Sequence, residues 1–147
     1  MARYADQGVI PVPRAKLWSF LNLHTQADVI SQIHPEVVSQ QVVSEAPGEV
    51  VVARGIDFRG KVRPNTWKIS SHPPDTLRWE VLDAPDGPMV KGSWVANRYS
   101  DAPGGTLVAT EGDITVLGLP GFLQKRLART VLGRIDKQDQ AYLRTHP

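Results

Sequence analysis

The chain has 147 residues, 41% hydrophobic and 22% charged, which is typical of one soluble globular domain spanning residues 1–147. It contains no cysteine, which excludes disulfides and thiolate metal sites, and its net charge of +2 is too small to indicate nucleic-acid binding. No apolar run reaches transmembrane length and the first residues lack the apolar core of a signal peptide, so we expect a cytoplasmic protein without stable membrane insertion.

The first third of the chain predicts one short strand followed by two short helices. An extended run within residues 3–12 ends at a pair of prolines, which suits a strand end followed by a helix start. Apolar residues crowd one side of residues 14–23, as expected for a helix. A second helix over residues 25–33 would stop before His34-Pro35, because a residue that precedes proline disfavours the helical conformation.

The middle of the chain changes to a period of two, which is typical of β-strands. Six strand-like runs are separated by short clusters of proline, glycine and aspartate: 37–43, 49–58, 61–70, 77–82, 89–99 and 106–116. Short turns between consecutive strands favour an antiparallel meander.

The last stretch, residues 119–144, predicts a long amphipathic helix that starts near Pro120. Leu123, Leu127 and Val131 repeat at helical spacing, whereas polar residues such as Gln124 lie on the opposite face. At 1.5 Å per residue the helix is roughly 38 Å long. The predicted fold is therefore α+β: a curved antiparallel sheet of about seven strands closed by a long C-terminal helix, with two short helices after the first strand.

This order of elements resembles the helix-grip fold of the START-like (SRPBCC) superfamily. The local resemblance is strongest at residues 92–94 (GSW), 105–108 (GTLV) and 119–122 (LPGF), which match the "G-x-W … G-T-x-V … P … long helix" ending of bacterial members. Residues 12–18 (VPRAKLW) are similar to the usual opening of those proteins. The superfamily includes plant pathogenesis-related allergens, lipid-transfer START domains and bacterial polyketide cyclases. These motifs are structural, so the resemblance implies a fold and leaves the function open.

Strand alternation predicts which side chains face the helix. Bulky tryptophans mix with glycine and alanine on the predicted inner faces, and small residues beneath a long helix leave space for a cavity. An aromatic wall could hold a flat or lipid-like ligand, or could be plain core packing. The predicted ligand-binding residues are Arg54, Phe58, Asn65, Trp67, Trp79, Trp94, Arg98, Gly112 and Val131.

Arg54 is the most informative of these residues because it shares a strand face with Val52 and Ile56. Burying an unpaired guanidinium is costly. Arg54 therefore either reaches a rim or pairs with a core acid, or it anchors a ligand inside a cavity. For the next strand, residues 61–70, it stays open which side chains face inward, because Pro64 could mark a bulge.

The histidines do not follow metal-binding spacing, so we expect no metal site and no cofactor. His34 falls in a turn that borders the cavity mouth in this superfamily, but a general base needs a partner and the sequence indicates none. No nucleophile elbow, catalytic triad order or phosphate-binding loop is present. The basic outer face of the last helix is either solvated or a patch that binds a membrane surface or nucleic acid.

Three functional hypotheses follow. The first is a protein that binds a hydrophobic small molecule, lipid-like or polyketide-like, between the sheet and the helix. The second is an enzyme similar to polyketide cyclases and aromatases, with Arg54, Asn65 and His34 as candidate polar groups. The third is an interaction module similar to co-chaperone or quinone-binding relatives. The ligand, catalytic turnover and the oligomeric state stay open.

Overall fold

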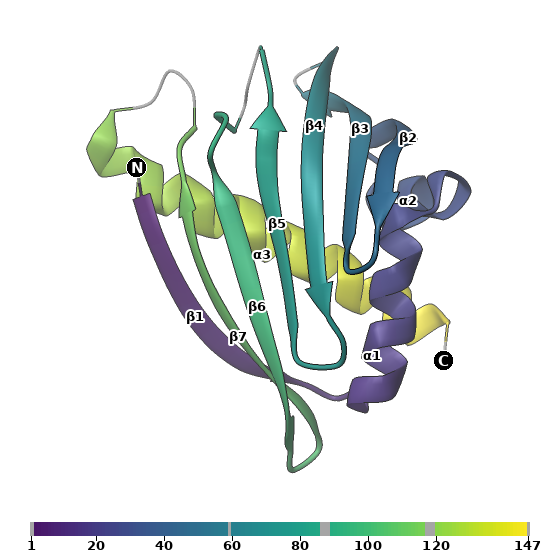
Figure 1. Cartoon of the computed structure of the whole chain (residues 1–147). Coiled ribbons are helices and arrows are strands. Elements are labelled where there is room, and N and C mark those ends of the chain that lie inside the picture. Colours follow the sequence, from purple (N-terminus) through teal and green to yellow (C-terminus); the bar gives the residue numbers. More distant parts are fainter. Residues whose placement is uncertain (1, 59, 86–88, 117–119, 147) are drawn as a thin grey trace.

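The computed structural model describes residues 2–58, 60–85, 89–116 and 120–146, and it contains one seven-stranded antiparallel sheet that curves around a long helix (Figure 1). The strands are β1 (Ala2–Ile10), β2 (Val37–Ala46), β3 (Glu49–Phe58), β4 (Lys61–His72), β5 (Thr76–Asp83), β6 (Trp94–Ala102) and β7 (Gly105–Ile114). The helices are α1 (Arg14–Leu21), the 3-10 helix η1 (Asn22–Thr25), α2 (Ala27–Ile33) and α3 (Gly121–Thr145). This arrangement confirms the predicted α+β fold.

The sheet follows the predicted meander, with the first strand added at one edge. The strand order is β1-β7-β6-β5-β4-β3-β2, so β1 pairs with the last strand. Helix α3 crosses one face of the sheet, and α1 and α2 lie near its C-terminal end (Figure 1). Strands β3 and β4 pair without a register shift, with Pro64 opposite Gly55, so Pro64 marks no bulge between these strands.

The buried side chain of Gln124 links helix α3 to the end of the sheet, although the sequence predicted it on the polar face of the helix. Gln124 is 7% exposed, accepts a hydrogen bond from the backbone N–H of Val116 (2.7 Å) and donates one to the Val116 carbonyl (2.7 Å). The side-chain amide therefore pairs with the chain just after β7 as a neighbouring strand would. The predicted helix start at residue 119 lies outside the described residues.

Strand β6 begins later than predicted, and this difference matters for the site. Met89 forms only an isolated bridge with Val116, and the backbone turns at Gly92, which has a positive φ of 91°. Regular pairing starts at Trp94. The predicted continuous run over residues 89–99 is therefore wrong, because Gly92 interrupts the alternation that the prediction carried across it.

Two apolar clusters hold the fold together. One lies between the middle of the sheet and the first half of α3: Val52, Trp67, Val81, Met89, Val95, Ile114 and Val116, with Leu127 and Leu132 packed against it. The other lies where α1 and α2 meet the end of α3: Leu17, Trp18, Phe20, Ile33, Tyr99 and Leu143. Among the described residues, no helix is long and apolar enough to cross a membrane.

Candidate functional site

A cavity of about 510 Å³ lies between the concave face of the sheet and α3. Its volume falls within the range of roughly 300–1,000 Å³ that is typical of small-molecule sites. Side chains from β3, β4, β5, β6 and β7 line one side, and residues of α3 line the other. The long helix therefore does not pack flush against the sheet.

One end of the cavity is apolar. The rings of Trp67 and Trp79 meet edge to face with their centroids 4.9 Å apart. Val95 and Ile114, which are both 1% exposed, continue this wall, and Leu127 faces it from α3. Such a surface favours the hydrocarbon or ring portion of a ligand.

Most of the predicted binding residues lie on the cavity wall. Register explains part of this result, because Arg54 pairs directly with Asn65 and Val52 pairs with Trp67, so both pairs project to the same side. The predicted residues that line the cavity are Arg54, Phe58, Asn65, Trp67, Trp79 and Val131.

Trp94 and Arg98 are not among the lining residues, because the alternation of β6 has the opposite phase from the prediction. Val95, Asn97 and Tyr99 face the cavity instead. Trp94 packs under the guanidinium of Arg78, 5.0 Å from its ring centroid, while Arg98 is exposed. The prediction carried the alternation of residues 89–92 forward into β6. The turn at Gly92 interrupts this alternation before Trp94.

Gly112 does not provide the open space that the sequence suggested. A Cβ at this position would lie 2.6 Å from the backbone carbonyl oxygen of Trp94 and 3.0 Å from a methyl group of Val95. Glycine is required here because β6 and β7 approach each other closely.

In the described part of the chain, the hydrogen-bond partners of the Arg54 guanidinium inside the cavity are neutral. Its Nε donates to Oε1 of Gln40 (2.5 Å), and its Nη2 donates to the backbone carbonyl of His24 (3.0 Å), which also accepts a bond from Nε2 of Gln40. Among the described residues no carboxylate lies within ion-pair distance of Arg54. Burial lowers the pKa of the Arg54 guanidinium to about 10, so the group stays charged at neutral pH without a counter-ion.

The polar end of the cavity also contains two histidines that share one carboxylate. Nε2 of His24 lies 3.1 Å and Nε2 of His34 lies 3.0 Å from Oδ1 of Asp139, and all three residues line the cavity. Burial lowers the pKa of His34, but its contacts with Asp139, Gln138 and Glu36 together outweigh burial and leave this pKa raised. Burial raises the pKa of Asp139, but its bonds to the two imidazoles outweigh burial and leave it lowered.

Sequence spacing did not group these three residues. They come from η1, from the residue after α2 and from α3, with more than 100 positions between the histidines and the aspartate. Asp139 is the partner that His34 lacked in the sequence. Only the fold of α3 across the sheet brings the three side chains together, so no local motif could have found them.

The exposed lining residues indicate that the cavity opens to solvent along the seam between β1 and α3. The lining residues Gln7, Gly8 and Val9 on β1 are exposed, as are Gly133 and Arg134 on α3. A Cβ at Gly133 would meet no atom within 4 Å. This seam is therefore the natural entrance for a ligand.

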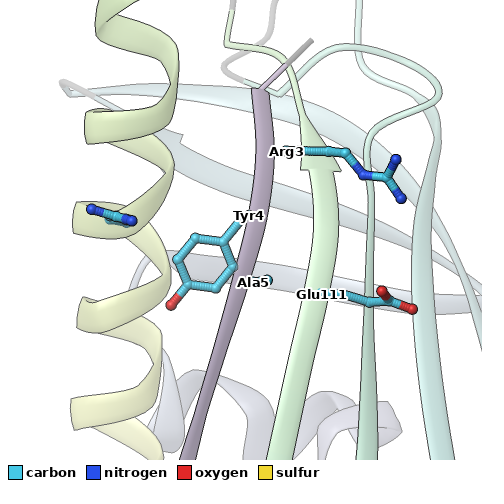
Figure 2. A pocket seen from close by; sticks show the side chains of 5 residues that line it. Arg3, Tyr4, Ala5 and Glu111 are labelled. Carbon is cyan, nitrogen blue, oxygen red and sulfur yellow. The ribbon is translucent and has the colours of Figure 1, made fainter.

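A second, shallower depression lies outside the same seam. It has a volume of about 260 Å³ and is lined by Arg3, Tyr4, Ala5, Glu111 and Arg129. Figure 2 shows Tyr4 extending from β1 toward α3, whereas Arg3 and Glu111 point away from the helix. Because its volume is below the usual range for small-molecule sites, we assign it no ligand.

Comparison with solved structures identifies the fold. The crystal structure of Ara h 8.0201 superposes with a TM-score of 0.78 at 16% sequence identity, covering 99% of both chains. A START superfamily protein from Mycobacterium smegmatis matches with a TM-score of 0.76 at 12% identity, again over 99% of both chains. The chain has the START-like helix-grip fold.

The di-domain ARO/CYC BexL from the BE-7585A biosynthetic pathway shares this START-like fold. It matches with a TM-score of 0.74 at 16% identity, and the alignment covers 99% of this chain and 49% of BexL. No protein-family model matches the chain, and no curated protein matches it in sequence. The comparisons therefore establish the fold, as the sequence motifs predicted, and leave the ligand to be argued from the cavity.

Proposed function

We propose that this protein binds one amphipathic molecule, lipid-like or polyketide-like, in the cavity between the sheet and α3. The apolar body of the ligand would lie against Trp67 and Trp79. Its anionic or carbonyl-bearing end would lie near Arg54, where a guanidinium can donate hydrogen bonds to oxygen.

The observation that carries this proposal is the charged, unpaired Arg54 inside a cavity of about 510 Å³. An isolated buried charge is costly, and neutral acceptors satisfy only part of its donor capacity. A ligand oxygen would use the remaining N–H groups. The fold supports the same conclusion, because hydrophobic small-molecule binding is consistent with the START-like neighbours.

The first experiment measures occupancy of the cavity. An environment-sensitive apolar dye should bind the folded protein near 1:1 and quench tryptophan emission. Gly133→Phe should block binding, because the new ring enters the entrance seam. Ala141→Phe is the matched control, since Ala141 is exposed on α3 and does not line the cavity. Equal dye binding by both variants would contradict the proposal.

The second experiment measures the chemical preference of the polar end. Displacement of the dye by a fatty acid and by its methyl ester should give a clear preference for the acid in the wild type. Arg54→Met should weaken acid binding and leave ester binding nearly unchanged, whereas Arg98→Met, on the exposed face, should change neither. An unchanged preference in Arg54→Met would remove Arg54 from the proposed site.

An aromatase/cyclase-type enzyme is a second candidate function. The observation that favours it is the pair of His34 and Asp139 inside the cavity, since an imidazole held by a carboxylate can move a proton. Turnover of a poly-β-keto thioester mimic by the wild type, and its loss in His34→Gln with dye binding preserved, would favour the enzyme over the carrier.

A further inference from the structure

The cluster of His24, His34 and Asp139 has the composition and spacing of a metal-binding site. The donor atoms of the three side chains lie within 4.8 Å of one another on the cavity wall. Each histidine Nε2 lies 3.0–3.1 Å from the same Asp139 oxygen. A tetrahedral ion with bonds of about 2.0–2.1 Å holds its donor atoms about 3.3 Å apart, which is close to the two Nε2–Oδ1 distances. The donor atoms of the two histidines lie within 4.8 Å of each other.

The other nitrogen of each ring fixes which atom carries a proton. Nδ1 of His24 lies 3.2 Å from the backbone carbonyl of Leu21, which can only accept a hydrogen bond. Nδ1 of His34 lies 2.5 Å from Oε1 of Gln138, and Gln138 is oriented because its Nε2 donates to Glu36. Both Nδ1 atoms are therefore donors. A neutral ring that carries its proton at Nδ1 presents a bare lone pair at Nε2.

Two Nε2 lone pairs and a carboxylate oxygen at these distances repel one another unless positive charge lies between them. Two additional protons would supply that charge, and one divalent cation would replace both of them. Hydrogen bonds from Nδ1 to carbonyl oxygens are the usual outer contacts of metal-binding histidines, since they fix the ring orientation and increase the basicity of Nε2.

We propose that His24, His34 and Asp139 bind a divalent first-row transition metal ion of the class of Zn²⁺ and Co²⁺. Imidazole and carboxylate together suit these ions. Three protein ligands would leave at least one coordination position open to the cavity, because all three side chains line the cavity. The backbone at His24 is pre-organised, because Arg54 and Gln40 both donate hydrogen bonds to its carbonyl oxygen. The metal site does not depend on an organic ligand.

The test is metal binding by protein that has been stripped with a chelator. Titration with Zn²⁺ should show one ion per chain, and Co²⁺ should give absorption bands of a nitrogen- and oxygen-coordinated ion. Asp139→Asn and His34→Gln should each weaken Zn²⁺ binding by more than about 100-fold, while the outer variant Gln138→Leu should lose about 10–100-fold. His72→Gln, which removes an exposed histidine outside the cluster, should leave affinity unchanged.

Binding by the wild type that is no tighter than binding by Asp139→Asn would overturn the proposal, as would loss of binding in His72→Gln. Thermal melting in chelator identifies any variant that fails to fold. For that case, the double variant His72→Gln/His146→Gln retains only the two histidines of the cluster. Zn²⁺ must then shift both Nε2 resonances in its ¹⁵N spectrum, and unshifted resonances would also overturn the proposal.

The same samples separate this inference from the proposed function. Dye binding that persists in stripped protein, without any Zn²⁺ binding, would remove the metal site and leave the carrier proposal standing. Tight Zn²⁺ binding without dye binding would remove the carrier proposal and leave the metal site standing.

Discussion

The two ends of the cavity are built in different ways. The apolar end comes from neighbouring strands, where Trp67 and Trp79 project to one side because alternate residues of paired strands do so. The polar end comes from segments far apart in sequence, where α3 brings Asp139 to His24 and His34. Asp139 lies seven residues beyond Leu132, or roughly 10 Å along the helix axis. A single helix therefore closes an apolar pocket with its first half and supplies the charge of a polar cluster with its second.

Removal of α3 should abolish both ends together and has the largest expected effect. Deletion from Gln124 onward exposes the apolar concave face and removes the bonds to Val116. Each lost leucine-sized group costs roughly 1.5–3 kcal/mol, so a few exceed the usual stability of a domain. The truncated chain should be insoluble or lack a cooperative melting transition by circular dichroism. A soluble product with a sharp transition would contradict the role of α3.

Glycine substitutions should separate close strand packing from the open entrance. Gly112→Ala should destabilise the protein strongly, because the new Cβ would clash with the backbone of Trp94. Gly133→Ala should stabilise it by up to ~1 kcal/mol, since alanine is the better helix former and its Cβ meets nothing. Urea unfolding of both variants measures the difference. A loss of stability in Gly133→Ala would show that the entrance is filled.

Tryptophan truncation should distinguish the apolar wall from the outer face of the sheet. Trp67 is 4% exposed within the main apolar cluster, so Trp67→Ala should cost about 3–5 kcal/mol in the free energy of unfolding. Trp94→Ala should cost far less and leave dye binding intact, because Trp94 belongs to neither buried apolar cluster and its contact with Arg78 is worth about 0.5–1 kcal/mol. Chemical denaturation followed by circular dichroism provides both values. Equal losses would mean that the phase of β6 is not the one described.

Substitution of Arg54 should have a small net effect on stability and the clearest effect on binding. Arg54→Met loses two hydrogen bonds to neutral groups and removes a desolvated charge, and these contributions oppose each other. We expect a change in the free energy of unfolding of less than about 1.5 kcal/mol, measured by thermal and urea melting. A loss of about 3–5 kcal/mol would indicate a broken buried ion pair and a structural Arg54.

The contrast between the two ends also explains what the sequence could predict. Period-two alternation and turn residues identified the strands, and alternation placed Arg54, Asn65 and Trp79 on the inner face. The same rule failed for Trp94 and Arg98, because one glycine turn ahead of the strand reset the phase. The prediction placed Gln124 on the solvent face because its side chain is polar. In the structure it is buried, because its amide makes two hydrogen bonds to the backbone of Val116, a tertiary contact that helical periodicity does not reveal.

Strand alternation could not predict the cluster of His24, His34 and Asp139. Its three residues carry no common periodicity, and their distance depends on where α3 crosses the sheet. Alternation describes neighbours within one layer, whereas this cluster depends on the packing between layers.

The most direct test of the central claim is a crystal structure with a saturating fatty acid. The account predicts one molecule in the cavity, with its alkyl chain against Trp67 and Trp79 and its carboxylate within hydrogen-bond distance of the Arg54 guanidinium. A fatty acid bound only outside the cavity, or a cavity filled by side chains while the ligand is bound elsewhere, would contradict the account.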